Sequence, residues 1–366
     1  MSIPSLPTVV DGKFKSSAIT YTDYKSPFRI STVQVPADVG PNEVLIKTQA
    51  ASINPVDLIR KILSPTSWFY ETPTKRAGGD FAGIVVKAGA DTGYQPGDRV
   101  YGDQLDRSGL TGSLSEYLLL DPSKVFTFDK IPEGLTFAEA AGIPLAGNTA
   151  YGALKAHEKP LKGGHVLILG AGTSVGHYAA QLTKYHFEVK SIVGTASSGS
   201  FDRVRKYGVD KLIDYTKGPT HEINEILEAV KENGKFDLVI DTVRDPILFG
   251  YLDTVLKPDS EGGVFLQIKG SKTLNYKSGH YLDVLPQWQF YLETLKEGWG
   301  LSKFKFVGFT KYQNRDFLAI VKGLLEKKEF TVDIDSKYDF KDFQAAFDRV
   351  ASVKSKGKVI IEFPSD

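Results

Sequence analysis

Residues 163–182 read GGHVLILGAGTSVGHYAAQL, and this stretch decides the fold. The apolar run at 166–169 predicts a short buried strand, the run at 170–176 predicts a glycine-rich turn, and the amphipathic run from Ser174 predicts a helix. A strand, turn and helix in this order present backbone N–H groups and the positive end of a helix dipole, which suits a pyrophosphate. Glycine-rich turns also serve as plain connectors, so the turn alone leaves both possibilities open.

The sequence around this turn predicts a parallel sheet with helices on both faces. From about residue 136, helical runs alternate five times with strand-like runs, which are VLILG, VKSIVG, KLIDY, FDLVIDTV and GGVFLQI. Residues 304–309, with the lysine before them, can add a sixth strand. Nearly continuous apolar strands separated by helices are typical of a doubly wound α/β fold.

The two ends of the chain have a different pattern. Residues 1 to about 135 contain short alternating runs and turn signals such as Pro96-Gly97-Asp98, which predict a compact, mostly β domain. After two amphipathic helical runs, the chain closes with GKVII at 357–361. A final strand in that place does not easily extend the parallel series, so we expect it to return to the first domain.

Composition limits the classes of partner and chemistry. A chain of 366 residues is long enough for two domains, and 45 basic against 44 acidic side chains give a net charge of +1, which predicts no nucleic-acid partner. The absence of cysteine excludes disulfides, thiolate catalysis and cysteine-ligated zinc. With no signal-peptide pattern and no long apolar run, we expect a cytoplasmic protein without an integral membrane segment.

Several separated motifs match one family in order and spacing. They are INPVD at 53–57, GGDFAGIVVKAGA at 78–90, PGDRVYG at 96–102, GSLSEYLLL at 112–120, PLAGNTAYGAL at 144–154, FDLVIDTV at 236–243 and the closing GKVII. Together with the glycine-rich turn, they resemble the medium-chain dehydrogenase/reductase superfamily. Within it, the chain is most similar to the zinc-free quinone oxidoreductase branch, with its zeta-crystallin-like and fungal quinone-oxidoreductase-like members.

The resemblance implies an architecture, a cofactor and an assembly. A GroES-like, mostly β domain made of residues 1–137 and 311–366 is expected to flank a Rossmann domain made of residues 138–310. The resemblance places NADPH in the cleft between the two domains, with a small quinone or carbonyl substrate opposite the nicotinamide. It also implies an oligomer, of which a homodimer is the form that we expect.

Zinc-dependent relatives hold their metal with cysteine and histidine. This chain has no cysteine, and its six histidines show no paired spacing such as H-x-x-x-H, so we predict no metal site. Hydride transfer to a conjugated acceptor depends on distance and alignment, and the reduced nicotinamide carries the reducing power. This favours a quinone or an α,β-unsaturated carbonyl as substrate over metal-assisted alcohol oxidation.

The first candidate cofactor residues lie in the glycine-rich turn. The branch usually has GAAGGVG in this place, whereas this chain has GAGTSVG, so Thr173 and Ser174 replace two glycines. A threonine there can narrow the approach to the phosphates or can contribute a hydroxyl hydrogen bond. With Gly172 and Val175, these residues form the predicted phosphate-binding turn.

Cofactor choice is set where the second strand ends, because an acid there binds the ribose of NAD and repels a 2′-phosphate. No acid stands from 194 to 200, while Ser197 and Ser198 offer hydroxyls and Arg203 offers a positive charge, so NADPH is favoured. The serines can equally build a plain loop, with Arg203 as a solvated helix charge. Members of the branch often have a lysine soon after this strand, where this chain has serine.

The resemblance supplies three further contacts. It places Asn54, in the NPVD motif, facing the nicotinamide, where an amide can orient the substrate carbonyl or the carboxamide. The alternative for Asn54 is a structural Asn-Pro turn. Tyr215 resembles the adenosine-side tyrosine of the family, and Thr149 resembles a cofactor-contacting threonine, although Thr149 can also be an ordinary helix residue.

A tyrosine acid is not transferred from the family. Some relatives have a tyrosine two residues after the aspartate of the NPVD motif, and this chain has Ile59 there. Tyr70 and Tyr101 are nearby, but we interpret both as packing residues, and Asp57 can be a helix cap or a structural ion-pair partner. Backbone N–H groups, Asn54 or water can instead stabilise the charge that develops on the acceptor oxygen.

The sequence and the resemblance support two alternative hypotheses of function. The leading hypothesis is an NADPH-dependent reductase that transfers hydride to a quinone or an α,β-unsaturated carbonyl without metal. The alternative is a catalytically degenerate member of the same fold that binds NADPH, a protein or a lipid surface as a sensor or scaffold. The altered turn, Ile59, and Arg244 at a position where the family has glycine motivate the alternative.

Overall fold

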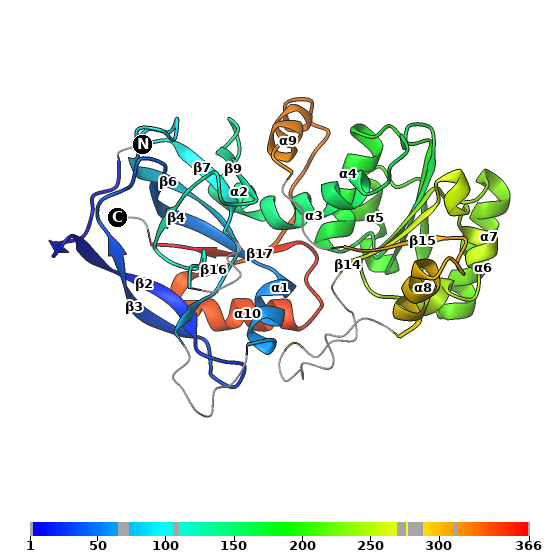
Figure 1. Ribbon diagram of the computed structural model, residues 1–366, viewed down its shortest axis with the longest axis horizontal. Coiled ribbons are helices and arrows are strands. Elements are labelled where there is room, and N and C mark those ends of the chain that lie inside the picture. The colour runs from blue at the N-terminus through cyan, green and yellow to red at the C-terminus, as the bar shows by residue number, and fades with distance from the viewer. Residues whose placement is uncertain are drawn as a thin grey trace.

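The computed structural model describes residues 3–64, 73–104, 110–268, 276, 288–309 and 314–364. In this part of the chain the strands form three sheets. Figure 1 shows two of them at the left of an elongated molecule and the third at the right, with helix α3 (Pro144–Lys155) between them. The chain therefore forms two layered bodies joined through α3.

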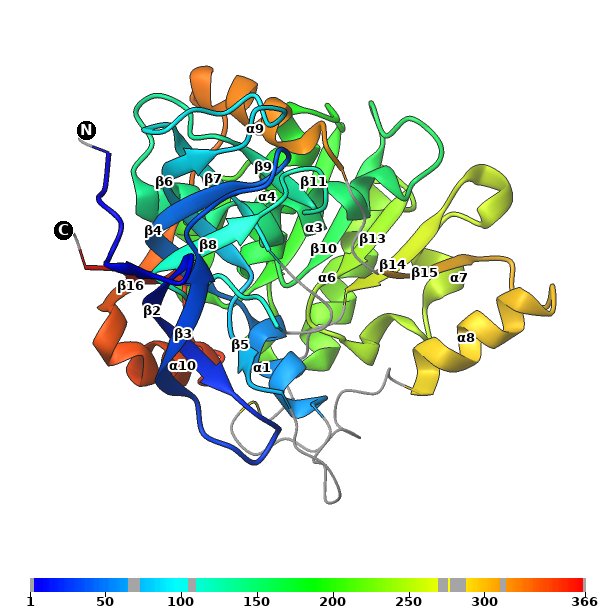
Figure 2. The same cartoon turned by 60° about the vertical axis from the view of Figure 1, so that its left-hand side comes forward.

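The sheet at the right is parallel and has the strand order β12-β11-β10-β13-β14-β15 within the described residues. The order reverses between β10 and β13, which is the place where doubly wound sheets bind ligands. Figure 2 labels β13, β14 and β15 of this sheet, with α8 beyond β15. Their bounds are His165–Leu169 for β10, Ser191–Ala196 for β11, Lys211–Asp214 for β12, Leu238–Asp241 for β13, Val264–Ile268 for β14 and Lys305–Phe309 for β15.

Helices cover both faces of the parallel sheet because its strands are apolar on both sides. Val166 and Ile168 of β10 belong to a core shared with α3 and α4, whereas Leu167 and Leu169 belong to a second core on the other face. This arrangement confirms the predicted doubly wound fold. The helices of this body are α4 (Ser174–Tyr185), α5 (Phe201–Arg205), α6 (Pro219–Asn233), α7 (Leu252–Val255) and α8 (Trp288–Gly298).

The body at the left is mostly β, as the sequence predicts, and all of its described strand pairs are antiparallel except β16 with β17. Its smaller sheet pairs β2 with β1, β3 and β5, and its larger sheet has the order β16-β17-β4-β6-β7-β9, with β8 paired to β4. The bounds are β1 Val9–Val10, β2 Lys13–Tyr21, β3 Arg29–Pro36, β4 Val44–Ile53, β5 Lys75–Arg76, β6 Asp80–Ala88, β7 Arg99–Asp103, β8 Tyr117–Leu120, β9 Thr127–Lys130, β16 Ile334–Asp339 and β17 Lys358–Glu362.

The last strand lies beside β4, far from its neighbours in sequence. β17 pairs antiparallel with β4, with Ile360 opposite Ser52, and β16 extends the sheet beyond β17. Both ends of the chain thus contribute to one sheet, while the domain boundaries at 137/138 and 310/311 stay predictions. The remaining helices are α1 (Pro55–Ile62), α2 (Phe137–Gly142), α9 (Phe317–Glu326) and α10 (Phe343–Ala351).

Candidate functional site

The glycine-rich turn lies at the reversal point of the parallel sheet. Gly170 follows β10 with φ +82°, and a Cβ atom there would lie 2.5 Å from Oγ1 of Thr242, which follows β13. A Cβ atom on Gly176 would lie 2.3 Å from the carbonyl oxygen of Gly170. Both contacts are too short for a side chain, so the backbone requires glycine at these two positions.

Thr173 and Ser174 occupy positions that do not require glycine. Thr173 has φ −75° and is the N-cap of α4, where its Oγ1 accepts a hydrogen bond from the Gly176 N–H at 3.0 Å. The same hydroxyl lies 3.0 Å from the Thr242 hydroxyl, which joins the two sides of the reversal point. Ser174 is the first residue of α4. The two departures from the glycine pattern therefore fit the turn.

Several backbone N–H groups of the turn are available as hydrogen-bond donors. Within the described residues, the backbone N–H groups of Gly172, Ser174 and Val175 have no acceptor, and all three residues are only partly buried. Two of these groups belong to the first turn of α4, where the helix dipole favours negative charge. A dinucleotide phosphate fits this set of donors, since it would satisfy them and would lie at the positive end of α4.

Arg203 lies beside the turn, and its guanidinium is already engaged. Its Nη2 donates to the carbonyl oxygen of Gly172 at 3.0 Å, and its Nη1 donates to the Tyr207 hydroxyl at 3.1 Å and to Asp333 Oδ2 at 3.3 Å. The Tyr207 hydroxyl also donates to Asp333. Arg203 thus joins the turn to the segment that leads into β16.

The predicted serines form the turn after β11. Ser197 Oγ lies 3.2 Å from Ser200 Oγ, and Ser198 is exposed. Asp214, at the end of β12, accepts hydrogen bonds from Thr216, and these bonds, with weaker ones from Ser198, lower the pKa of its carboxyl. Tyr215 follows Asp214 and is partly exposed. Four of the sequence-predicted positions therefore gather at the ends of β11 and β12 or beside them, namely Ser197, Ser198, Arg203 and Tyr215.

Asn54 lies in a buried polar cluster between the two bodies. Its Nδ2 donates to Asp80 Oδ2 at 2.9 Å, and its Oδ1 accepts from Lys358 Nζ at 2.6 Å. Lys358 Nζ also lies 3.2 Å from Asp80 Oδ2, and Ser52 Oγ donates to the same oxygen at 2.7 Å. The other oxygen of Asp80 accepts from the Leu145 N–H of α3 at 2.7 Å. The buried charges are thus paired and hydrogen-bonded, as their desolvation requires.

The sheet register brings this cluster together. Ser52 in β4 pairs with Asp80 in β6 on one side and with Ile360 in β17 on the other, so three adjacent strands supply the side chains. Asn54 follows β4 and caps α1, whose first residue is Pro55. On α3, Thr149 is nearly buried and its hydroxyl donates to the carbonyl oxygen of Leu145 at 2.7 Å. Thr149 and Asn54 therefore both lie next to the start of α3.

The other residues of the NPVD region have structural contacts. Asp57 Oδ2 accepts from the Asn54 N–H at 2.8 Å, which makes Asp57 a helix-capping residue, and burial raises the pKa of its carboxyl to about 6. Ile59 packs in the core beside α1. Tyr101 is buried in β7, where burial raises the pKa of its phenol, in keeping with a packing role. Tyr70 lies outside the described residues.

Several site residues were not predicted from the sequence. Asp80 and Lys358 lie within the GGDFAG and GKVII motifs, so the motifs contained both residues, but nothing local indicated that they pair across 278 residues. Thr242 lies in FDLVIDTV and was likewise not singled out. Arg244 adopts φ +57°, the left-handed conformation that glycine takes without strain, which accounts for glycine at this place in the family pattern.

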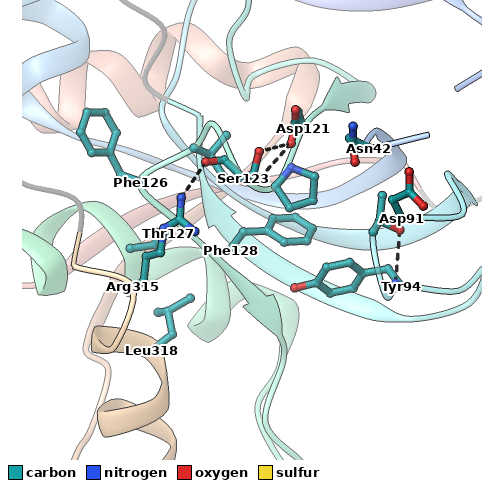
Figure 3. A pocket seen from close by; sticks show the side chains of 13 residues that line it. Asn42, Asp91, Tyr94, Asp121, Ser123, Phe126, Thr127, Phe128, Arg315 and Leu318 are labelled. Atoms are coloured by element: carbon teal, nitrogen blue, oxygen red, sulfur yellow. Dashed lines mark hydrogen bonds between the residues drawn. The ribbon is translucent and has the colours of Figure 1, made fainter. Parts of the chain in front are cut away.

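Other features lie away from this site or offer no metal ligands. Within the described residues, no group of three or more His, Asp or Glu side chains could hold a metal ion, and no helix has the length and apolar character to cross a bilayer. A cavity of about 300 Å³ lies beside α9, and Figure 3 shows the side chains that line it, among them Arg315, whose Nη2 donates to the Ser123 carbonyl oxygen at 3.1 Å. This cavity contains neither the glycine-rich turn nor Asn54.

A parallel sheet with a glycine-rich turn at its reversal point, joined to a β body to which both ends of the chain contribute, defines the fold of a nucleotide-binding oxidoreductase. Residues 40–132 match the alcohol dehydrogenase GroES-like domain, and residues 207–361 match the zinc-binding dehydrogenase domain. The chain belongs to the medium-chain dehydrogenase/reductase superfamily and, within it, to the family of fungal YIM1 proteins. The sequence prediction of the superfamily is confirmed, and the fold of this superfamily binds a nicotinamide cofactor.

The similarity covers almost the whole chain. The chain is 33% identical to Protein YIM1-1 of Lachancea thermotolerans, over 94% of this chain and 97% of that protein. Among solved structures, the quinone oxidoreductase from Coxiella burnetii superposes with a TM-score of 0.73 at 22% identity, over 95% of this chain and 99% of that chain. The CurK enoyl reductase superposes with a TM-score of 0.73 at 19% identity, over 97% of this chain and 100% of that chain. These structural likenesses establish the fold.

Proposed function

We propose that this oxidoreductase uses NADPH to reduce a quinone or an α,β-unsaturated carbonyl without a metal. The observation that carries the proposal is the set of three N–H groups without acceptors in the turn, at Gly172, Ser174 and Val175, at the reversal point of the sheet. A quinone oxidoreductase and an enoyl reductase share the fold, which supports this substrate class. The cysteine-free sequence supports a reaction that needs no zinc.

The residues of the turn would bind the cofactor, and Asn54 would act on the substrate. When bound, NADPH supplies a hydride to an electrophilic carbon of the acceptor. The electron pair displaced by this hydride moves to the acceptor oxygen, and a proton from solvent completes the reduction. For an enal, this proton is taken up at the α-carbon. Donors placed near this oxygen lower the barrier because its negative charge grows in the transition state.

Asn54 is suited to that task. Its amide has two N–H donors, of which one binds Asp80. Lys358 donates to the amide oxygen at 2.6 Å, and the ammonium charge polarises the amide so that its remaining N–H becomes a stronger donor. In this proposal, Asn54 binds the acceptor oxygen and Lys358 positions and polarises Asn54.

The preference for NADPH is supported by the end of β11. No Asp or Glu is present from 194 to 200, so no acid of this turn would repel a 2′-phosphate. Ser197 and Ser198 lie on the turn, and Ser198 is exposed. Arg203 lies beside this turn, but Asp333 pairs with its guanidinium, which also binds the carbonyl oxygen of Gly172.

The proposal is tested with the full-length protein in two measurements. Calorimetry with NADPH and with NADH gives the cofactor affinity, and the loss of nicotinamide absorbance with a panel of quinones and enals gives turnover. We expect NADPH to bind more tightly than NADH and to be consumed with at least one acceptor. Tight binding of NADPH without turnover of any acceptor would replace the reductase with the sensor role, and no nucleotide binding would refute both roles.

A further inference from the structure

We propose that Lys356 supplies the positive charge that selects NADPH over NADH. This inference rests on the proposed function and concerns the cofactor side of the same site. Lys356 lies in the loop between α10 and β17, yet its Nζ donates to the carbonyl oxygen of Gly199 at 3.4 Å, across 157 residues of sequence. Gly199 belongs to the turn after β11, where dinucleotide-binding folds distinguish a ribose hydroxyl from a 2′-phosphate.

The backbone of Lys356 is held firmly. Its N–H donates to Asp335 Oδ1 at 2.7 Å, and Arg349 binds both oxygens of Asp335, at 2.7 and 2.6 Å. The hydrogen-bonded Arg349 guanidinium lowers the pKa of the Asp335 carboxyl to about 2, so this anchor keeps its charge at neutral pH. The flexible four-carbon stem of Lys356 therefore starts from a fixed point and can move its ammonium over a short distance.

No carboxylate among the described residues neutralises the ammonium charge of Lys356, whereas Asp333 neutralises the guanidinium charge of Arg203. Arg203 is paired with the Asp333 carboxylate and binds the Gly172 carbonyl oxygen. In the described part of the chain, the ammonium of Lys356 has a neutral carbonyl as its partner and no carboxylate within 4 Å. A phosphate with about two negative charges is a stronger acceptor than a carbonyl, so Lys356 would exchange Gly199 for the phosphate.

The turn beside Lys356 has room for a ligand. Ser198 and Gly199 are exposed, and the nearest atom to a Cβ built on Gly199 is Lys356 Nζ, at 3.9 Å. Two acids lie close to this turn, and both have partners: the Asp214 carboxylate accepts hydrogen bonds from Thr216 and Ser198, and Asp202 pairs with Arg205 at 3.2 Å. Members of the branch often have a lysine soon after β11, and this chain has serine there. In this inference, Lys356 supplies the same positive charge from a distant part of the chain.

The test is cofactor binding by the full-length protein, measured by calorimetry without substrate. We expect Lys356→Gln to weaken NADPH binding about tenfold and to change NADH binding less than about twofold, because NADH has no 2′-phosphate. The affinity for NADPH should also depend less on salt in this variant. Lys354→Gln is the matched control, since it removes the same charge from the same loop, and it should leave both affinities within about twofold.

Three outcomes would overturn the inference. They are an equal loss of NADPH and NADH affinity in Lys356→Gln, an equal effect of Lys354→Gln, and tighter binding of NADH than of NADPH by the natural protein. Unchanged thermal unfolding of both variants would show that the fold is intact. The binding test contains no substrate, so its result is independent of turnover. If Lys356 selects NADPH in this test but the protein reduces no quinone or enal in the separate turnover assay, the inference is supported and the proposed reaction is refuted.

Discussion

Lys358 donates a hydrogen bond to the side-chain oxygen of Asn54 at 2.6 Å, although 304 residues separate them in the sequence. The two side chains belong to a cluster that is closed by Asp80, and the side chains of Lys358 and Asp80 are 3% and 0% exposed. A lysine buried this deeply is stable only because a carboxylate and an amide oxygen replace its water. The final strand therefore supports the residue that we place next to the substrate.

Replacing Lys358 with methionine should destabilise the protein by about 3–5 kcal/mol, because the Asp80 carboxylate would remain buried without its cation. Urea unfolding measures this change in the free energy of unfolding. The matched control is Lys337→Met on β16, whose ion pair with Glu362 is about half exposed on both sides and should be worth less than about 1 kcal/mol. A loss below about 1 kcal/mol for Lys358→Met would contradict the assigned role of the cluster.

Replacing Asn54 with alanine should lower kcat for quinone or enal reduction roughly a hundredfold, because a donor to the developing oxyanion is lost. The affinity for NADPH should hardly change, since Asn54 is not part of the glycine-rich turn that we propose to bind the phosphates. Steady-state kinetics with the best acceptor and calorimetry with NADPH provide the two measurements.

The control for Asn54 is Ser52→Ala. This variant removes another donor to Asp80, at 2.7 Å, and leaves the amide in place. It should lower kcat much less than Asn54→Ala does. If the two variants lower kcat equally, Asn54 acts only as a structural member of the cluster.

Replacing Thr173 with alanine should cost about 1 kcal/mol of stability, because Thr173 caps α4 through its hydroxyl. Thr173→Ser keeps the hydroxyl and should retain most of the stability. Chemical unfolding measures the stability of both variants. If Thr173→Ser loses as much stability as Thr173→Ala, the methyl group and not the capping hydroxyl stabilises the turn. Since this threonine fits the turn, neither variant should abolish NADPH binding.

Stability should fall in acid because of His177, which stacks on Tyr207 with ring centroids 3.9 Å apart. Burial lowers the pKa of its imidazole to about 4, against about 6.5 in the unfolded chain. Its contribution is fully present above about pH 6.5 and is lost as the pH falls through the folded value near 4, since the unfolded state then binds the proton more readily. The largest loss is about 3 kcal/mol.

The contribution of His177 is isolated by comparing the protein with His177→Phe, which keeps an aromatic ring against Tyr207. The difference in unfolding free energy between the two proteins should change by about 3 kcal/mol from pH 7 to pH 4. Buried Asp57 has a raised pKa and acts in the opposite direction, but it is present in both proteins and cancels. A difference that does not change with pH would contradict the buried, neutral histidine.

The sequence alone was enough to determine the local elements and the superfamily. The run at 166–169 is apolar on both faces and is followed by glycines at 170 and 176, where the backbone leaves no room for a side chain. Strand, turn and helix depend on neighbouring residues, so their pattern is visible in the sequence. The order of the motifs along the chain then predicted a doubly wound nucleotide-binding body next to a β body.

Only the tertiary structure decided which side chains work together. The register of β17, β4 and β6 places Lys358 and Asp80 against Asn54, and the loop before β17 places Lys356 against the turn after β11. It also showed that Arg203, the cation nearest to this turn in sequence, is already paired with Asp333. Such contacts depend on pairing between distant strands, and a local pattern of residue types contains no information about that pairing.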